Sequence, residues 1–301
     1  MCKISIITIN YNGLNDTCSL IESIPDDEDI EVVVVDNASY NNEATTIKNR
    51  FPNVILIHSD KNLGFAGGNN LGINAAHGDY LFLINNDTIF KGDKKIVKYE
   101  INALINRLES SDNIGIVCPK ICFSWDNNPI QFAGYTRLSK ITLRNHPIGF
   151  GEEDRGQYND PCPSPYAHGA AMIIKRSALE KVGLMPECYF LYYEELDWSM
   201  MFHRAGYDIW YDPSMTIYHK ESQTTGQNSP LRTYYMTRNR FIFAQRNIPS
   251  PKRFLTFFYL SVVVGGRDVL FHLLKRKFSL AKATLIGILD FAKNRQGIKD
   301  F

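Results

Sequence analysis

The sequence lacks the cysteine spacing of a zinc site or a disulfide scaffold. Its six cysteines are scattered over 301 residues, and no two of them form a CxxC pair. Structural zinc sites use closely spaced cysteines, and disulfide scaffolds carry many cysteines in a short chain. The N-terminus, "MCKISIITIN", also has no basic segment, long apolar core or cleavage site of a secretory signal. We therefore expect a cytoplasmic protein with reduced thiols.

The sequence also has no large net charge and none of the common nucleotide-binding motifs. The net charge is +1, so no overall field attracts nucleic acid, and we expect no nucleic-acid partner. Neither GxGxxG after the first strand nor GxxxxGK[ST] occurs. Gly64, Gly67 and Gly68 lie instead in "DKNLGFAGGNN", before a predicted helix. There they allow either close approach of a phosphate to the backbone or an ordinary turn.

Strand and helix patterns alternate through the first half of the chain, which predicts an α/β fold. Short apolar runs predict strands, and apolar positions at helical spacing predict helices between them. Repeated strand–helix–strand units favour a Rossmann-like, mainly parallel sheet flanked by helices. The predicted strands are Ile4–Ile9, Glu31–Val35, Val54–His58, Tyr80–Ile84 and Ile114–Val117, and the helices are Asn15–Ile24, Gly68–Ala76 and Lys94–Leu108.

The second half is less regular. Residues 124–165 have weak periodicity and many turn residues, so we expect loops or short hairpins over the sheet. A strand at 169–175 and helices at 177–182 and from 194 to Gly206 follow, with short strands at 208–211 and 216–219.

The C-terminal part, from Arg238 onward, is helical, apolar and basic in pattern. Its longest apolar run, "RFLTFFYLSVVVGG", ends at Arg267 and Asp268, which makes it too short to span a bilayer. The amphipathic pattern fits helices that lie in a membrane interface. The alternative is a helix pair packed on the rest of the protein or on a partner chain.

Polar side chains end the predicted parallel strands, at the edge where ligands of such sheets bind. Asp36 suits a ribose hydroxyl or a base N–H, or alternatively a turn cap. The stretch "LFLINNDTIF" ends a buried strand in Asn85-Asn86-Asp87. Asp87 is either a helix cap or a ligand of Mg²⁺ or Mn²⁺. Such a cation needs only one or two protein carboxylates when a diphosphate supplies further oxygens.

Several motifs together resemble family-two glycosyltransferases of the GT-A fold, and most closely their rhamnosyltransferase-like subgroup. The motifs are "ISIITINYNGLNDT", "VVVVDNAS", "NLGFAGGNNLGI", "GDYLFLINNDT", "HGAAMIIKRSALEKVGL" and "FLYYEELDWSMMFHRAGY". The resemblance implies a GT-A domain at 1–246, with a nucleotide-binding half at about 1–120 and an acceptor half at 121–246. Residues 247–301 form a helical, possible membrane-associating extension.

The resemblance also implies transfer of a sugar, with inversion, from a nucleotide-diphosphate sugar to an acceptor hydroxyl. The family carries an Asp-x-Asp that binds a divalent cation, Mg²⁺ or Mn²⁺. Here Asn85 replaces the first Asp and Asp87 keeps the second, so the departure removes one anionic ligand. His219 matches a histidine that is a metal ligand in several relatives, or it is a structural histidine.

Donor contacts are implied for a further set of residues. Thr8, Asn10 and Asp36 match positions around the nucleoside, and Asn85 and Asn86 lie at the donor diphosphate. Residues of the glycine loop fall near the diphosphate and sugar: Lys61, Asn62, Gly64 and Asn69. Arg238, with Arg240, either holds the diphosphate or carries helix-surface charge or contacts a lipid headgroup.

The acidic motif "EELD" matches the family's catalytic base. Glu195 aligns with the base, although relatives more often have Asp there, and Glu194 is the second choice. A carboxylate near the acceptor can remove its proton as it attacks; alternatively the motif is an acidic first turn that favours the helix dipole. His168 is expected to shape the place where acceptor and donor meet, and Trp198 either stacks on an acceptor sugar or packs the helix.

The sequence thus predicts single sugar addition, since the Gln-x-x-Arg-Trp of processive relatives is absent. The subgroup suggests deoxythymidine-diphosphate rhamnose as donor. A glycan or lipid-linked acceptor in cell-surface polysaccharide synthesis is expected, at the inner face of the membrane. Two alternatives stay open: a catalytically impaired scaffold subunit, suggested by Asn85, and a sugar nucleotidyltransferase, disfavoured because "NYNGLNDT" has no cation.

Overall fold

A computed structural model describes residues 3–125, 127–139, 142–220 and 229–299. Within these ranges the strands form one ten-stranded sheet in which β3-β2-β1-β4-β9-β6-β10-β5 are successive neighbours. β1 to β4 run parallel, β9 is inserted antiparallel between β4 and β6, and β10 runs parallel to β6. The strands are β1 (Ile4–Asn10), β2 (Ile30–Asn37), β3 (Ile55–Ser59), β4 (Tyr80–Ile84), β5 (Thr88–Phe90), β6 (Ile114–Phe123), β7 (Ile130–Phe132), β8 (Cys162–Pro163), β9 (Ala171–Lys175) and β10 (Asp208–His219).

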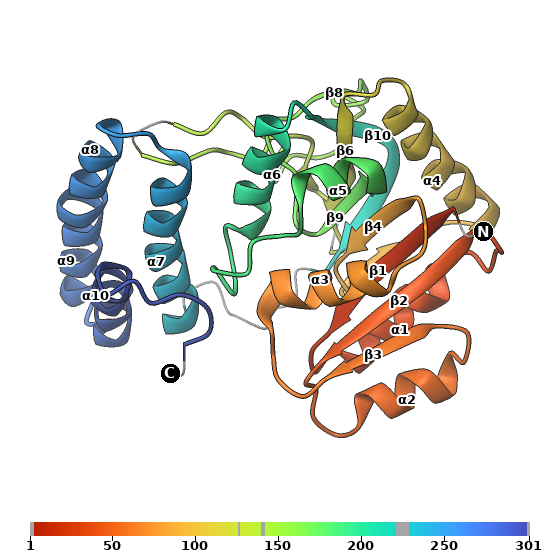
Figure 1. Ribbon diagram of the computed structural model, residues 1–301, viewed down its shortest axis with the longest axis horizontal. Helices are drawn as coiled ribbons and strands as arrows, with labels where there is room; N and C mark the ends of the chain where they lie inside the picture. The colour runs from red at the N-terminus through yellow and green to blue at the C-terminus, as the bar shows by residue number, and fades with distance from the viewer. Residues whose placement is uncertain (1–2, 126, 140–141, 221–228, 300–301) are drawn as a thin grey trace.

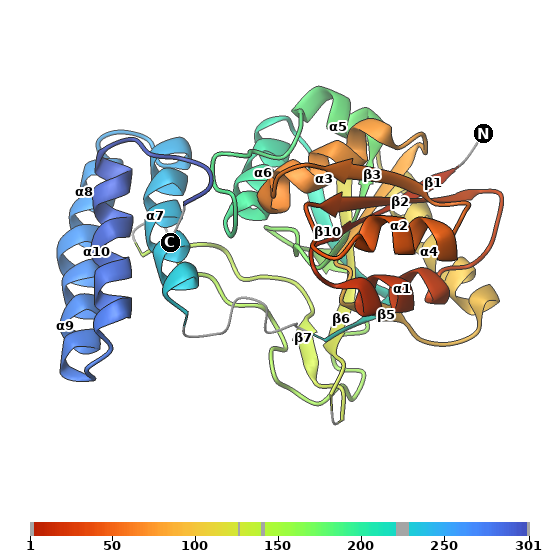
Figure 2. The same ribbon diagram turned by 90° about the horizontal axis from the view of Figure 1, so that it is seen from below.

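Helices cover both faces of this sheet. Figure 2 shows α3, α5 and α6 on one face and α1, α2 and α4 on the other. Gly68 and Gly72 let α3 approach β1, since a Cβ at Gly72 would lie 2.3 Å from Ile7 Cγ2. The helices are α1 (Leu14–Ser23), α2 (Glu43–Arg50), α3 (Gly64–Ala75), α4 (Lys94–Glu109), α5 (Arg176–Val182) and α6 (Glu194–Arg204).

The C-terminal helices stand beside the sheet as a second layer (Figure 1). They are α7 (Pro230–Asn247), α8 (Lys252–Phe258), the π-helical segment η2 (Tyr259–Gly265), α9 (Gly266–Leu274) and α10 (Phe278–Ala292). Phe241, Phe243 and Val264 form a core here with Tyr189 and Tyr193, which precede α6. The helical layer is therefore packed against the segment that leads into the acidic helix.

The predicted α/β fold is confirmed, with several differences in its elements, among them the unpredicted strand β5 and a longer β6. Helix α2 was not predicted, because only Ile47 of its side chains is buried and no apolar stripe marks it. The two short strands after Gly206 are one strand, β10, with an irregularity between Asp212 and Thr216. Helix α7 begins at Pro230, earlier than expected, where the Ser229 hydroxyl caps it by accepting from the Arg232 N–H at 3.1 Å.

The helix that contains the apolar run is longer than the sequence predicted. Helix Lys252–Leu274 has 23 residues, a mean hydropathy of 1.5 over 18 of them, and only 22% of that window is buried. The helix continues through Arg267 and Asp268, which pair with each other at 2.6 Å. By length and composition alone this helix could cross a membrane, which for a single helix is weak support.

Candidate functional site

The carboxyl ends of the parallel strands open into a cavity of about 430 Å³. Six of the predicted site residues line it: Asn62, Gly64, Asn69, Asn85, Asn86 and Asp87. Gly169, at the start of the segment leading into β9, lines the cavity as well. The opposite wall comes from Phe190, Leu191, Leu231, Tyr235, Ile298 and Lys299. The cavity therefore lies between the sheet edge and the C-terminal layer.

A buried polar network fixes Asp36 at the end of β2. Asn10 donates to Asp36 Oδ1 at 3.0 Å, and His58 Nδ1 lies 2.9 Å from Asp36 Oδ2. Thr17 in turn donates to Asn10 Oδ1 at 2.7 Å. Asn10 thus orients the carboxylate, whose oxygens can each accept a further hydrogen bond. A nucleoside hydroxyl or base N–H is a suitable donor.

Five predicted donor residues do not line this cavity: Thr8, Asn10, Asp36, Lys61 and Arg238. Thr8 is fully buried, and its hydroxyl has no hydrogen-bond partner in the described part of the chain. Lys61 is exposed and does not line the cavity. Alternation along β1 explains Thr8, since Ile9 is the residue of that strand that faces the cavity.

The glycine loop holds its shape through a close backbone contact. Gly64 has φ +73°, and a Cβ there would lie 2.2 Å from the carbonyl oxygen of Phe190. The same oxygen accepts from the Phe65 N–H at 2.9 Å. Asn62 Oδ1 accepts from the Gly64 N–H at 2.8 Å. Glycine is therefore required at position 64 both by the left-handed backbone and by lack of space.

Asp87 and His219 meet at the metal-binding edge that the sequence predicts. His219 Nε2 lies 3.1 Å from Asp87 Oδ1, and both side chains are buried. His219 Nδ1 lies 2.8 Å from Gln131 Oε1, which orients the ring. When the Nδ1–H of His219 donates to Gln131, the lone pair of His219 Nε2 faces the carboxylate oxygen of Asp87. A divalent cation would stabilise that arrangement.

Asp87 and His219 fit as ligands of a divalent cation whose coordination is completed by a diphosphate. Among the described residues no three His, Cys, Asp or Glu side chains gather around one point. A carboxylate and an imidazole, with the Asn85 and Asn86 amides nearby in the cavity wall, give too few anionic ligands to complete a shell. Mg²⁺ and Mn²⁺ commonly take their remaining oxygens from substrate phosphates.

The acidic helix α6 begins in a strained segment. Phe190, Tyr192 and Tyr193 have φ of +71°, +68° and +79°, a region that bulky residues rarely adopt. Such strain persists only where the surroundings hold the backbone, and it is common at functional sites. Here it turns the chain so that Glu195 lies beside the cavity. A Cβ on the cavity-lining Gly169 would be 3.8 Å from Glu195 Cγ.

The two glutamates at the start of α6 differ in environment. Glu194 is fully buried, and neither carboxyl oxygen has a hydrogen-bond partner among the described residues. Burial and the neighbouring Glu195 raise the pKa of Glu194 well above its usual range. Burial also raises the pKa of Glu195. A raised pKa brings a carboxylate closer to the range in which it can accept a proton efficiently at neutral pH.

Arg238 does not contact the cavity, which corrects the predicted donor role. Its guanidinium is 1% exposed and donates to the carbonyl oxygens of Tyr189 at 2.7 Å and Gly297 at 2.8 Å. The adjacent Asn239 amide lies within hydrogen-bond distance of three carbonyl oxygens, those of Tyr189, Leu191 and Tyr192. Arg238 and Asn239 therefore hold the strained segment in place.

Trp198 is not available to an acceptor sugar, which corrects that prediction too. Its side chain is fully buried, packs edge-on against Phe202 and donates from Nε1 to the Gly183 carbonyl at 3.0 Å. His168 is stacked on Tyr135 with ring centroids 5.9 Å apart. Burial lowers the pKa of His168 to about 3. His168 does not line the cavity, and its predicted shape-setting role stays a prediction.

Residues that sequence reasoning missed form the opposite wall of the cavity. Lys299 is its cationic lining residue, and its backbone N–H donates to the Tyr235 hydroxyl at 2.9 Å. Its ammonium lies 3.0 Å from Asp290 Oδ2. Ile298 and Lys299 lie beyond the recognisable motifs, and the return of the chain after α10 brings them to the sheet edge. Phe190 and Leu191 lie within the motif "FLYYEELDWSMMFHRAGY", but no pattern in the sequence marks them as cavity residues.

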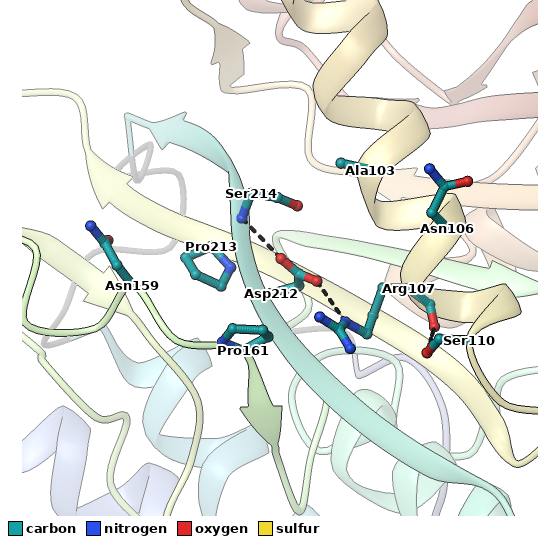
Figure 3. Close-up of a pocket in the computed structure, with 9 residues that line it drawn as sticks. All are labelled: Ala103, Asn106, Arg107, Ser110, Asn159, Pro161, Asp212, Pro213 and Ser214. Atoms are coloured by element: carbon teal, nitrogen blue, oxygen red, sulfur yellow. Dashed lines mark hydrogen bonds and ion pairs between the residues drawn. The ribbon is translucent and has the colours of Figure 1, made fainter.

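A larger cavity, about 660 Å³, lies between α4 and the irregular part of β10 (Figure 3). Its Arg107 and Asp212 are joined at 2.8 Å, and the Ser214 N–H donates to the same carboxylate at 2.9 Å. These charged groups neutralise each other. The site residues predicted from the strand ends are absent from its described lining.

Comparison with known proteins assigns this chain to a family. The model of glycosyl transferase family 2 matches residues 5–183, more than half of the chain. The low-salt glycan biosynthesis hexosyltransferase Agl10 of Haloferax volcanii is 27% identical over 98% of this chain and 92% of that protein. The dTDP-rhamnosyl transferase RfbF of Shigella flexneri is 22% identical over 96% and 95%. An N-acetylglucosaminyl-diphospho-decaprenol L-rhamnosyltransferase of Mycobacterium tuberculosis is 23% identical over 73% and 76%.

Solved structures share the fold. The mannosyltransferase PcManGT of Pyrobaculum calidifontis, solved with GDP-Man and Mn²⁺, has a TM-score of 0.57 and 14% identity, covering 97% of this chain and 88% of that one. GalNAc-T7, solved with UDP, GalNAc and Mn²⁺, has a TM-score of 0.59 and 14% identity, over 85% and 54%. The expected GT-A fold is confirmed, and the relatives include rhamnosyltransferases, as the resemblance implied.

Proposed function

The chain belongs to glycosyl transferase family 2, and from this premise we propose that it transfers one sugar, with inversion, from a nucleotide-diphosphate sugar to an acceptor hydroxyl. One observation carries the proposal. The cavity that contains Asn85, Asn86 and Asp87 also contains Gly169, and Glu195 lies against that glycine. A diphosphate site and a carboxylate base thus border the same space, as transfer requires.

The donor is bound by residues at the strand ends. Asp36, oriented by Asn10, accepts hydrogen bonds from the nucleoside, and the Asn62–Gly64 loop lies along the phosphates. Asp87 and His219 would hold a divalent cation, which neutralises charge on the departing diphosphate when it is bound. The mannosyltransferase and GalNAc-T7 structures with Mn²⁺ support this choice of cation. The RfbF relative supports dTDP-rhamnose as the donor to test first.

Glu195 acts as the general base. It accepts the proton of the acceptor hydroxyl as the oxygen attacks the anomeric carbon from the face opposite the leaving diphosphate. Burial raises the pKa of Glu195, which makes its carboxylate a stronger base. Glu194 is fully buried, whereas Glu195 is partly exposed, so we assign the base to Glu195.

A panel of nucleotide sugars, with and without Mn²⁺, tests the donor site by thermal shift, since a bound donor stabilises the fold. The stabilising donor is then used in a hydrolysis and transfer assay with wild type, Asp87→Ala and Glu195→Gln. We expect activity in wild type and large losses in both variants. Wild type that binds a donor but neither hydrolyses nor transfers it would support the catalytically impaired scaffold instead. Full activity of Glu195→Gln would exclude the assigned base.

We further propose that the protein works at the cytoplasmic membrane surface on a glycan or lipid-linked acceptor. Phe254, Leu255 and Phe258 of α8 are 64%, 67% and 65% exposed. Aromatic and aliphatic side chains exposed together, beside basic residues, suit a membrane interface. The double variant Phe254→Ser/Phe258→Ser should lose flotation with anionic liposomes. Tyr99→Ser, which removes an equally exposed side chain on α4, should float as wild type does.

A further inference from the structure

Two aromatic side chains, Trp125 and Phe150, lie exposed on the loops beyond the carboxyl end of β6, and we call them the aromatic patch. They are 48% and 58% exposed. Both contact the buried Phe123, which ends β6. The Trp125 ring is stacked on Phe123 with centroids 3.9 Å apart, and the Phe150 ring lies edge-on to it at 5.5 Å. Because Phe123 covers one face of Trp125, the face that remains exposed is the opposite one.

Local hydrogen bonds hold the backbone of both residues of the aromatic patch. The Trp125 carbonyl oxygen accepts from the Asn128 N–H at 2.9 Å. Phe150 lies in a tight turn, in which the Gly149 carbonyl oxygen accepts from the Glu152 N–H at 2.9 Å. These hydrogen bonds and the contacts with the buried ring position both exposed rings before a ligand arrives. Such positioning lowers the cost of ordering side chains on binding.

The loop of Trp125 lies beside His219, a residue of the proposed cation site. Phe123 is opposite His219 in the pairing of β6 with β10, and adjacent strands are about 4.8 Å apart. The Ser124 N–H donates to the His219 carbonyl oxygen at 2.9 Å. On its other side β10 pairs with β5, where Thr88 is opposite His219. The strand order β5-β10-β6 therefore places the Trp125 loop next to His219, on the side away from Thr88.

The turn of Phe150 is connected to the same histidine through β7. The Ile130 N–H donates to the Glu152 carbonyl oxygen at 2.8 Å. The next residue, Gln131, has its Oε1 2.8 Å from His219 Nδ1. Both loops of the aromatic patch are thus hydrogen-bonded, directly or through one residue, to the edge of the sheet where sugar transfer is proposed.

The polar groups beside the aromatic patch match an uncharged sugar better than a membrane. In the Phe150 turn, the exposed Glu152 carboxylate accepts from the Tyr158 hydroxyl at 3.1 Å and has further acceptor positions. Near Trp125, the Lys91 ammonium donates to Asn128 Oδ1 at 2.8 Å. One charge of each sign does not give the cationic excess that attracts an anionic bilayer. A pyranose ring has a C–H face that packs on an aromatic ring, and hydroxyls at its edge that need donors and acceptors.

We propose that the aromatic patch binds a sugar ring of the acceptor glycan, separate from the sugar whose hydroxyl is glycosylated. The bound ring packs on the exposed face of Trp125 and against Phe150, and its hydroxyls contact Glu152. The proposal rests on the proposed function, because it assigns a second contact to the acceptor of the same reaction. It requires an acceptor longer than a single sugar, with pyranose rings whose substituents are mainly equatorial, since these leave the C–H face flat.

The test measures binding of chitohexaose and cellohexaose, whose rings have equatorial substituents, to the full chain by isothermal titration calorimetry. Wild type should bind at least one of the two sugars. Trp125→Ala and Phe150→Ala should each weaken that binding by about tenfold or more, as expected for loss of an aromatic contact at the centre of a binding site. Tyr99→Ala, which removes an aromatic side chain that is 74% exposed on α4, should bind as wild type does. Circular dichroism confirms that the variants fold.

Tryptophan fluorescence locates the bound sugar. The chain has three tryptophans, of which Trp198 is fully buried and Trp125 is half exposed. The bound hexasaccharide should therefore reduce quenching by acrylamide in wild type, and this reduction should be absent in Trp125→Ala. A reduction that persists in Trp125→Ala would mean that the sugar binds elsewhere and would overturn the inference.

The titration contains no donor and no cation, so its result does not depend on turnover. Binding of neither hexasaccharide, or equal binding by wild type and both patch variants, refutes the inference. If neither sugar binds, and wild type self-associates in analytical ultracentrifugation whereas Phe150→Ala does not, the aromatic patch is a contact between copies of the chain instead. If wild type hydrolyses a nucleotide sugar but binds neither hexasaccharide, only this inference fails. If it binds a hexasaccharide but has no donor activity, the proposed function fails and sugar binding at the patch stands.

Discussion

Replacing Gly64 by alanine should separate backbone strain from crowding at the cavity. In Gly64→Ala the new Cβ would lie 2.2 Å from the Phe190 carbonyl oxygen, so that carbonyl must move. Moving it breaks the 2.9 Å hydrogen bond from the Phe65 N–H. The segment that moves is the strained one ahead of Glu194, so the change affects both stability and the donor cavity.

The magnitude follows from two contributions. An alanine with positive φ costs about 1–2 kcal/mol of unfolding free energy. A buried N–H left without its acceptor costs a further 1–3 kcal/mol or so. Gly206→Ala is the matched control, because Gly206 also has positive φ, at +87°, but nothing lies within 4 Å of its Cβ position. Gly64→Ala should therefore lose about 1–3 kcal/mol more than Gly206→Ala.

Urea denaturation of the two variants measures this difference. A thermal-shift titration with a nucleoside diphosphate then reports on the cavity, and stabilisation by the ligand should be reduced in Gly64→Ala only. Equal destabilisation of the two variants would refute the crowding argument. Normal nucleotide stabilisation in Gly64→Ala would show that the Phe190 segment is not a functional wall of the donor site.

Three other substitutions have defined outcomes. Glu195→Gln should lower kcat by roughly 10²–10⁴-fold, the usual contribution of a general base, with donor KM little changed in steady-state assays. Urea denaturation should show that Glu194→Gln gains unfolding free energy relative to wild type, and that this gain is larger at pH 8 than at pH 5. The pKa of Glu194 is raised in the folded state above its ordinary value of 4.5. Wild type therefore loses stability as the pH rises from about 4.5 through the folded-state pKa, because the buried carboxylate then becomes charged. An equal difference at both pH values would contradict this. Asn239→Asp places carboxylate oxygens against three carbonyls and should cost about 2 kcal/mol or more in urea, whereas the exposed Asn106→Asp should be near neutral.

The sequence was sufficient where local pattern and strand direction decide the outcome. Polar residues after parallel strands must meet at one sheet edge, so Asn85, Asn86 and Asp87 could be placed in one cavity with Asn62 and Gly64. The pairing of Asp87 with His219 came only from the family resemblance, because antiparallel β5 and β10 bring the two together from positions far apart in the chain.

The sequence was not sufficient where burial decides what a polar or aromatic side chain does. Arg238 and Arg240 are two residues apart on one helix, and the sequence gives no reason to separate them. The structure does so because α10 and the following residues fold back over Arg238 and bury it, whereas Arg240 faces a groove between α7 and η2. Trp198 is similar, since only the closure of α6 onto the sheet removes its ring from solvent.

Under the proposed function, the path of the chain after α10 gives the C-terminal layer a part in donor binding that its distance along the chain conceals. The Gly297 N–H donates to the Cys188 carbonyl at 3.0 Å, and the next two residues line the cavity at the strand ends. A truncation designed to remove membrane affinity would therefore also remove a wall of that cavity. Loss of activity in such a protein would not demonstrate a need for the membrane. By thermodynamic reciprocity, any shift of this segment that a bilayer or a lipid favours would change donor affinity, and donor binding would change membrane affinity by the same factor.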